Sequence, residues 1–289
     1  MPSSDCGGHR DVSSRGPSHL DGSSSLDLSN EISEPLTGRK YEFQLYPLSF
    51  RELKQKYSRI EIQRLLEKRM IMGMYPEIEE KPEEDEQLLR GLASDYLFRD
   101  VLQYQDIRKP EILEKLITAL ALQAGNEVSY NELSTTLGVN KQTVMNYIQL
   151  LEKGFFIFRL PPFSRNLRNE LTTKRKIYFY DTGIRNALIN NFNSIDLRQD
   201  TGALWENFIL CERIKQLSNA GVAVNRYFWR THQGSEIDLI EERGGRLTGY
   251  EFKWKPTKWR PPKLFLSAYT GSSVEPVHRE NFEKFVMEC

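Results

Sequence analysis

Cysteine is scarce in this chain of 289 residues, which contains only Cys6, Cys211 and Cys289. The three are scattered and form no CxxC pair, so the sequence has neither a disulfide framework nor a cysteine-based zinc site. Long hydrophobic runs are also absent, because no uncharged apolar run reaches the roughly 18 to 20 residues that span a bilayer. The N-terminus has no apolar core of the kind that a secretory signal requires. These absences predict a cytoplasmic protein with no membrane partner.

Net charge is lacking as well, since 40 Lys and Arg balance 40 Asp and Glu. The total therefore predicts neither a polyanionic nor a polycationic partner. The charges are unevenly spread, however: residues 76–100 are strongly acidic, residues 158–176 carry six basic residues against Glu170 alone, and residues 252–263 carry five basic residues and no acid. Any contact with nucleic acid is therefore expected to be local.

Residues 111–182 have the pattern of a winged helix-turn-helix. Helical periodicity covers 111–123, and two further helices are predicted over 129–137 and 140–152 with a tight turn at Gly138. Two short aromatic strands, FFIFRL and KIYFY, then enclose a basic loop. The candidate DNA-binding residues lie on the second helix of the turn motif and in the loop: Asn140, Lys141, Gln142, Thr143, Asn146, Arg165, Arg168, Lys174 and Arg175. Winged helices also dock proteins or serve as structural modules, so both interpretations stay open.

The C-terminal region alternates helices and strands. A helix is predicted over 202–217, followed by strands over 226–230, 236–241 and 247–254, a short helix over 263–269 and a last strand near 274–278. This order predicts an α/β fold in which helices cover a mixed sheet.

The pair Gly244-Gly245 lies between two alternating runs and predicts a hairpin turn. If these glycines are the two central turn residues, Asp238 lies directly opposite Glu251 and Glu236 lies opposite Lys253. The same register predicts that the other face of the hairpin is apolar. That face pairs Ile237 with Phe252 and Leu239 with Tyr250.

Two carboxylates directly across a ladder repel each other unless a positive charge lies between them. The sequence therefore predicts a divalent metal at Asp238 and Glu251, and oxygen ligands favour Mg²⁺ or Mn²⁺ over zinc. Glu206, at the rim of the apolar face of its helix, is expected to complete a three-acid metal site. Lys253 projects from the same face as Glu251 and is a candidate to orient or deprotonate a water, or to hold a phosphate oxygen.

Glu206, Asp238 and the run Glu251-Phe252-Lys253 resemble the acid, D and ExK elements of the PD-(D/E)XK nuclease superfamily, in its helix, strand, strand order. The resemblance implies a nuclease-like domain over 183–289 in which Glu206, Asp238, Glu251 and Lys253 are catalytic. A structural ion-pair cluster in a domain that has lost catalysis is the alternative, so enzymatic activity remains open.

A wider resemblance covers residues 22–289 and includes the segments MYPEI, YLFRDVL, IYFYDTGIRNAL, LWENF, EIDLIEE and YEFKW. These segments are similar to the C-terminal half of a prokaryotic family of AAA+ type ATP-binding proteins that carry a domain of unknown function. Residues 1–25 are rich in Ser, Gly and Asp with almost no apolar side chains, which predicts a disordered tail. The resemblance implies that this tail is followed by a remnant of the AAA+ core (26–60), a helical connector (61–110), the winged helix (111–182) and the nuclease-like domain (183–289).

This sequence departs from that family in one respect, because it contains no GxxxxGK[ST] phosphate-binding loop. We therefore expect a truncated or split member with no ATP site of its own, partnered with a separate ATPase. Two functions follow. One is a Mg²⁺-dependent phosphodiesterase that acts on DNA, and the other is a non-catalytic DNA- or protein-binding module. The sequence predicts no oligomeric state.

Overall fold

The computed structural model describes residues 44–81, 83–95, 107, 109–164, 175–231 and 233–287. Helices and strands are mixed in it, with one three-stranded and one four-stranded sheet, in agreement with the predicted α/β class. The predicted tail and the loop residues Arg165, Arg168 and Lys174 lie outside the described residues. Within the described ranges, none of the helices has the length and apolar character needed to cross a bilayer.

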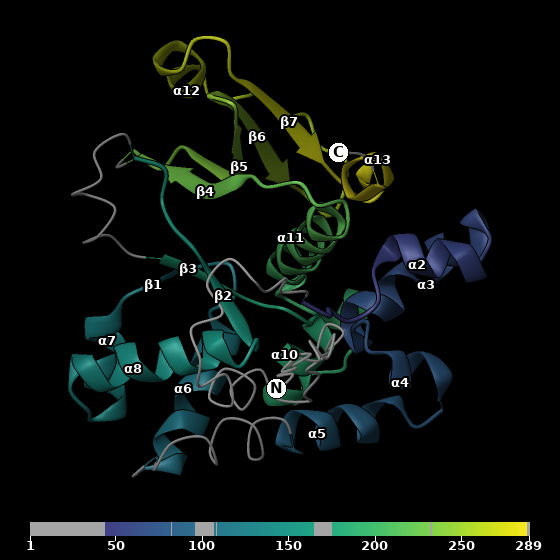
Figure 1. Cartoon of the computed structure of the whole chain (residues 1–289), viewed down its shortest axis with the longest axis vertical. Coiled ribbons are helices and arrows are strands. Elements are labelled where there is room, and N and C mark those ends of the chain that lie inside the picture. Colours follow the sequence, from purple (N-terminus) through teal and green to yellow (C-terminus); the bar gives the residue numbers. More distant parts are fainter. Residues whose placement is uncertain are drawn as a thin grey trace, which may run out of the picture.

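The described elements follow one another along the chain as labelled in Figure 1. The helices are α2 (Phe50–Lys56), α3 (Arg59–Met72), α4 (Pro76–Glu80), α5 (Asp85–Asp95), α6 (Pro110–Leu122), α7 (Tyr130–Leu137), α8 (Lys141–Lys153), α10 (Thr182–Leu188), α11 (Thr201–Asn219), α12 (Lys263–Ala268) and α13 (Phe282–Met287), with a 3₁₀ turn at Ile195–Leu197. The strands are β1 (Glu127–Val128), β2 (Ile157–Leu160), β3 (Arg175–Phe179), β4 (Asn225–Arg230), β5 (Glu236–Arg243), β6 (Arg246–Phe252) and β7 (Ser273–Val277).

The smaller sheet has the order β1-β3-β2 with antiparallel pairs. Along the chain, α6 precedes β1, and α7 and α8 lie between β1 and β2. Local sequence signals explain the two helices of the turn. The side chain of Ser129 accepts the Glu132 N–H at the start of α7, Gly138 ends that helix at φ +65°, and Asn140 caps α8. The three helices predicted for this region are therefore present within a residue or two of their expected ends.

The larger sheet has the order β4-β5-β6-β7. Its first three strands are antiparallel, whereas β7 runs parallel to β6 after a crossover that contains α12. The outer side of β4 is bonded to the segment after β2, because the Phe163 N–H donates to the Phe228 carbonyl (2.6 Å) and the Phe228 N–H donates to the Pro161 carbonyl (2.9 Å). On the opposite edge, β7 contains Pro276.

The turn between β5 and β6 has the predicted register. Gly244 and Gly245 have φ angles of +56° and +78°, the left-handed values that a two-residue turn of this kind requires at both positions. The Cα partners run from Arg243 opposite Arg246 to Leu239 opposite Tyr250. Beyond the pair of Leu239 and Tyr250, the Phe252 N–H donates to the Asp238 side chain at 2.8 Å. This hydrogen bond holds Asp238 against β6 where the ladder ends.

The predicted apolar face of the hairpin is wrong in one respect. The register of β4 on β5 shifts between Tyr227 and Trp229, so that two residues of β5, 238 and 239, lie opposite one residue of β4. After the shift, Leu239 packs with the core beneath α11, whereas Ile237 packs with the core on the other face of the sheet. Strict alternation fails here because a bulge turns Asp238 and Leu239 toward the same side.

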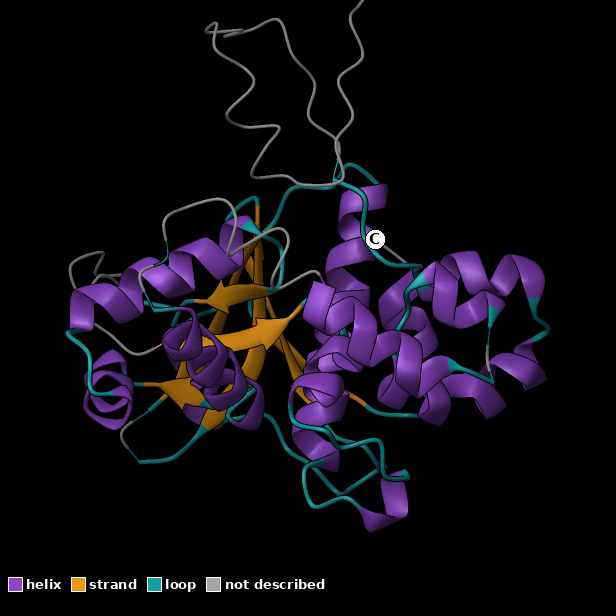
Figure 2. Ribbon diagram, turned by 90° about the horizontal axis from the view of Figure 1, so that it is seen from below, coloured by secondary structure: helices purple, strands orange, loops and turns teal. Residues whose placement is uncertain are grey.

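Helix α11 joins the two sheets. Figure 1 shows it at the centre of the molecule, and Figure 2 shows the strands between two groups of helices. Its Asn207 side chain accepts the Phe179 N–H (3.0 Å) and donates to the Phe179 carbonyl (2.7 Å), which attaches the helix to β3. The core around Trp205 and Phe208 then fixes α11 against β5 and β6. Glu206, between those aromatic residues, is thereby held between the two sheets.

Candidate functional site

The structure brings four predicted site residues to the same place, at the end of the β5–β6 ladder and beside α11. Asp238 lies on β5, Glu251 on β6, Lys253 just after β6 and Glu206 on α11. Asp238 and Glu251 are buried, and the side chain of Glu206 is 14% exposed. Close spacing of carboxylates in a poorly hydrated place disfavours their charged form.

The Glu206 carboxylate is bound by β3. It accepts hydrogen bonds from the Tyr178 hydroxyl (2.5 Å) and from the Lys176 ammonium (3.0 Å). Burial and the charge of Asp238 nevertheless raise the pKa of Glu206 to about 7, with Lys176 and Tyr178 acting in the opposite direction. Glu206 therefore leans toward the sheets, as its place on α11 predicts, and its first partners are the two β3 side chains.

The pKa values of both Glu251 and Asp238 are raised. Burial first, and then the charge of Asp238, raise the pKa of Glu251 to about 7, and burial also raises the pKa of Asp238. One Asp238 oxygen accepts the Phe252 N–H. The Glu251 Oε2 atom is buried and has no hydrogen-bond partner, which is unfavourable unless a further positive or donor group joins the site.

Lys253 lies next to Glu251, on the solvent-exposed side of the Asp238–Glu251 pair. Its ammonium lies 2.7 Å from Glu251 Oε1, and its side chain is 42% exposed. Partial burial lowers the pKa of Lys253, but Glu251 and Asp238 outweigh it and the net pKa is raised. Lys253 is therefore protonated near neutral pH, which suits it to holding an anionic oxygen and makes it a poor base toward water.

Sequence reasoning missed the lysine at the centre of the cluster. The Lys176 ammonium lies 2.6 Å from Glu236 Oε1, 3.0 Å from Glu206 Oε1 and 3.6 Å from Asp238 Oδ1. The available signal was Lys176 in the otherwise apolar strand KIYFY, because a buried lysine requires carboxylate partners. In the described ranges, no group of three or more Asp, Glu, His or Cys side chains is arranged to hold a metal ion.

The predicted DNA-binding residues of α8 lie at its exposed start. Asn140 is engaged locally, since its side chain accepts the Thr143 N–H (2.7 Å) and the Thr143 hydroxyl (3.0 Å). Gln142 donates to Asn146 at 2.8 Å, one turn further on. Lys141 is exposed, and Arg175 begins β3. The three amides and Thr143 therefore bond within the helix start, and Lys141 is the charged group there that is exposed to solvent.

A second basic surface follows the carboxylate cluster in the chain. Four exposed residues between the end of β6 and the start of α12 form what we call the basic strip: Lys255, Lys258, Arg260 and Lys263. None of the four is ion-paired with another residue in the part of the chain that the structure describes. The strip begins two residues after Lys253 in the chain.

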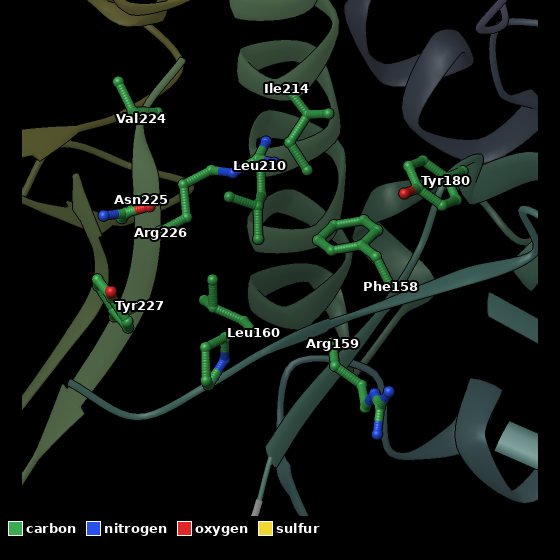
Figure 3. Close-up of a pocket in the computed structure, with 11 residues that line it drawn as sticks. Phe158, Arg159, Leu160, Tyr180, Leu210, Ile214, Val224, Asn225, Arg226 and Tyr227 are labelled. Carbon is green, nitrogen blue, oxygen red and sulfur yellow. The ribbon is translucent and has the colours of Figure 1, made fainter. Parts of the chain in front are cut away.

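A pocket of about 300 Å³ lies between β2, α11 and β4. Figure 3 shows Leu210 and Ile214 of α11 on one side, Phe158 and Tyr180 on another, and Arg226 reaching in from β4. Leu210 stands one helical turn after Glu206, so the pocket and the cluster share a face of α11. The pocket contains none of the predicted site residues.

Three domain families match the chain. An AAA domain matches residues 9–54, a domain of unknown function (DUF8612) matches residues 63–195, and a second domain of unknown function (DUF4143) matches residues 201–276. The matches support an AAA-domain-containing protein with domains of unknown function. The AAA match begins inside the segment predicted to be a disordered tail, and most of it lies outside the described residues.

Several curated proteins are similar to this chain, and all those that we compare are uncharacterized. A Mycobacterium tuberculosis protein is 30% identical over 236 residues, which cover 80% of this chain and 51% of that protein. A Methanocaldococcus jannaschii protein is 26% identical over 242 residues, with 76% and 52% covered, and a Haemophilus influenzae protein is 27% identical over 180 residues, with 59% and 45% covered. The chain thus spans about half the length of the relatives it matches. No solved structure matches it.

Proposed function

We propose that this AAA-domain-containing chain carries a Mg²⁺-dependent phosphodiesterase that acts on DNA, centred on Asp238, Glu251 and Lys253. The observation that carries the proposal is the buried, unpartnered Oε2 of Glu251 beside a second carboxylate that raises its pKa. Such an arrangement is unstable as an anion pair and is stabilised by a cation. The order α11, β5, β6 also supports a nuclease-like α/β domain of the PD-(D/E)XK type.

The donor set fits magnesium. Mg²⁺ prefers oxygen ligands and is commonly held by one or two carboxylates, with waters and substrate phosphates completing its coordination. Asp238 and Glu251 would hold it, and Glu206 would add negative charge from α11. When bound, Mg²⁺ polarises a phosphate oxygen and lowers the pKa of a water.

The chain's own residues would position the DNA. The protonated ammonium of Lys253 lies next to Glu251 and is partly exposed to solvent. It would hold a non-bridging oxygen of a bound phosphate. The basic strip would bind the backbone of the same strand through charge alone, independently of sequence. Helix α8, with Lys141 at its start, would contact the duplex as the second helix of a winged helix-turn-helix does.

The test is nicking of supercoiled plasmid with Mg²⁺ in the cytoplasmic pH range. We expect activity in the wild type, a loss of at least a hundredfold in Asp238→Ala and Glu251→Ala, and a partial loss in Lys253→Ala. Glu242→Ala is the matched control, because Glu242 lies on the same strand four residues after Asp238, and it should cut like the wild type. Absence of cutting by the wild type, or equal cutting by all variants, overturns the proposal.

A second candidate is a non-catalytic DNA- or protein-binding module that works with a separate ATPase. It is favoured by Lys176, a built-in cation that already neutralises part of the cluster. It predicts a salt-dependent DNA shift that survives Glu251→Ala, with no nicking. Combined Lys141→Ala and Arg165→Ala substitutions should abolish that shift if the turn motif forms the binding surface.

A further inference from the structure

Lys176 is a charged residue in a place where charge is unfavourable. It is the second residue of β3, the central strand of the smaller sheet, with Leu160 of β2 on one side and Glu127 of β1 on the other. Its side chain is only 3% exposed, and its ammonium lies 5.6 Å from the centre of the Phe228 ring. A lysine so deeply buried requires compensation by anions.

The compensating anions lie on α11 and on β5 of the larger sheet. An ammonium has three N–H donors, and three carboxylates surround this one, at 2.6 Å (Glu236), 3.0 Å (Glu206) and 3.6 Å (Asp238). Lys176 falls in the segment that matches one domain of unknown function, whereas all three carboxylates fall in the segment that matches the other. The two segments therefore share a single charged cluster.

We propose that Lys176 is an internal counter-ion that competes with a divalent cation for Asp238. The proposal rests on the metal site proposed above and concerns its regulation. A divalent ion on Asp238 and Glu251 and the Lys176 ammonium repel each other, because both are cations held by the same carboxylate. Glu206 and Glu236 retain the ammonium when it withdraws from Asp238, the most distant of its three partners.

This arrangement has two consequences. Without metal, Lys176 neutralises part of the cluster, because it supplies positive charge to three of its acids, Glu206, Glu236 and Asp238. Metal affinity is lower than the carboxylates alone would give, and it depends on β3, a strand of the smaller sheet. A shift of β3 that moves Lys176 away from Asp238 strengthens metal binding.

The experiment measures Mn²⁺ binding to the full chain by calorimetry, in Lys176→Met and Lys176→Gln beside the wild type. We expect both variants to bind Mn²⁺ at least tenfold more tightly, and Mn²⁺ to raise their melting temperature more than that of the wild type. Adding Asp238→Asn to either variant should remove the gain. Lys215→Met is the matched control, because Lys215 is an equally buried lysine that pairs with Glu212 away from the cluster, and its Mn²⁺ affinity should equal that of the wild type.

Equal or weaker Mn²⁺ binding in both Lys176 variants overturns the inference. A variant that folds only with Mn²⁺ supports it, and a pair of variants that stay unfolded with Mn²⁺ overturns it. The outcome is separable from the nuclease proposal. Wild-type nicking with unchanged affinity in the variants rejects only the role of Lys176, whereas tight Mn²⁺ binding by the variants without wild-type nicking rejects only the nuclease.

Discussion

Replacing Glu206 by Gln should change how the stability of the metal-free protein depends on pH. Glutamine keeps an oxygen that accepts the hydrogen bonds of Tyr178 and Lys176, and it resembles the protonated acid. Burial and Asp238 raise the pKa of Glu206 to about 7 in the folded chain, compared with about 4.3 for an unperturbed Glu. Between about pH 4.3 and pH 7, the folded wild type therefore keeps a proton on Glu206 that the unfolded state has released.

The sign follows from this difference in bound protons. Stability falls as pH rises wherever the folded state binds more protons than the unfolded state. Glu206 thus lowers the free energy of unfolding across the interval from its unfolded pKa to about 7, by about 1.4 kcal/mol for each pH unit. Over the two units between pH 5 and 7 the upper bound is roughly 3 kcal/mol, and coupling to Asp238 reduces it.

The assay is urea unfolding with EDTA present, followed by tryptophan fluorescence at several pH values. Glu206→Gln should have nearly the wild-type free energy of unfolding at pH 5 and exceed it by about 2 kcal/mol at pH 8. Glu242→Gln, on the exposed end of β5, is the control and should follow the wild type throughout. A pH-independent difference between Glu206→Gln and the wild type would refute the reasoning.

Three other outcomes are expected. Asp200→Asn removes the charge that pairs with buried Arg185 at 2.5 Å. The free energy of unfolding at neutral pH should therefore fall by about 2 kcal/mol, less than for a fully buried pair because Asp200 is partly exposed. Hydrogen bonds outweigh burial and lower the pKa of Asp200 to about 2, so the difference should vanish as pH falls through that value. Gly183→Ala should cost about 3 kcal/mol in the same assay, because a Cβ there would lie 2.3 Å from the Met72 carbonyl oxygen, whereas Gly202→Ala meets no atom within 4 Å and should be tolerated. Exchanging two residues of the basic strip for Gln should reduce the slope of log affinity against log salt by about 2 in DNA titrations.

Much of the fold was predictable because its signals are local. Ser129, Gly138 and Asn140 define the ends of two helices through capping and a left-handed turn, and the Gly244-Gly245 turn fixes the register of β5 on β6. These features depend on residues close in sequence. The cap of α10 is equally local, since the Asp181 side chain accepts the Ile184 N–H at 3.0 Å.

The rest of the site depends on contacts between residues distant in sequence. The shift that turns Asp238 and Leu239 to one side arises from pairing with β4, which the β5 sequence does not encode. Lys176 meets Glu206 where α11 is attached to β3, a contact that includes the hydrogen bonds of Asn207 to Phe179. The apolar strand KIYFY indicates that Lys176 is buried, but it does not indicate which acids pair with it, because those acids lie 30 residues or more away in sequence.

The edges of the larger sheet also bear on how this protein behaves in concentrated solution. An open strand edge presents free backbone groups to which another chain can add, and this is a common route to aggregation. Here the outer side of β4 is already bonded to the Pro161 and Phe163 backbone, and β7 is short and interrupted by Pro276, which has no N–H to donate. Strand addition by a second copy is therefore opposed at both edges of the sheet, so self-association through this sheet is disfavoured.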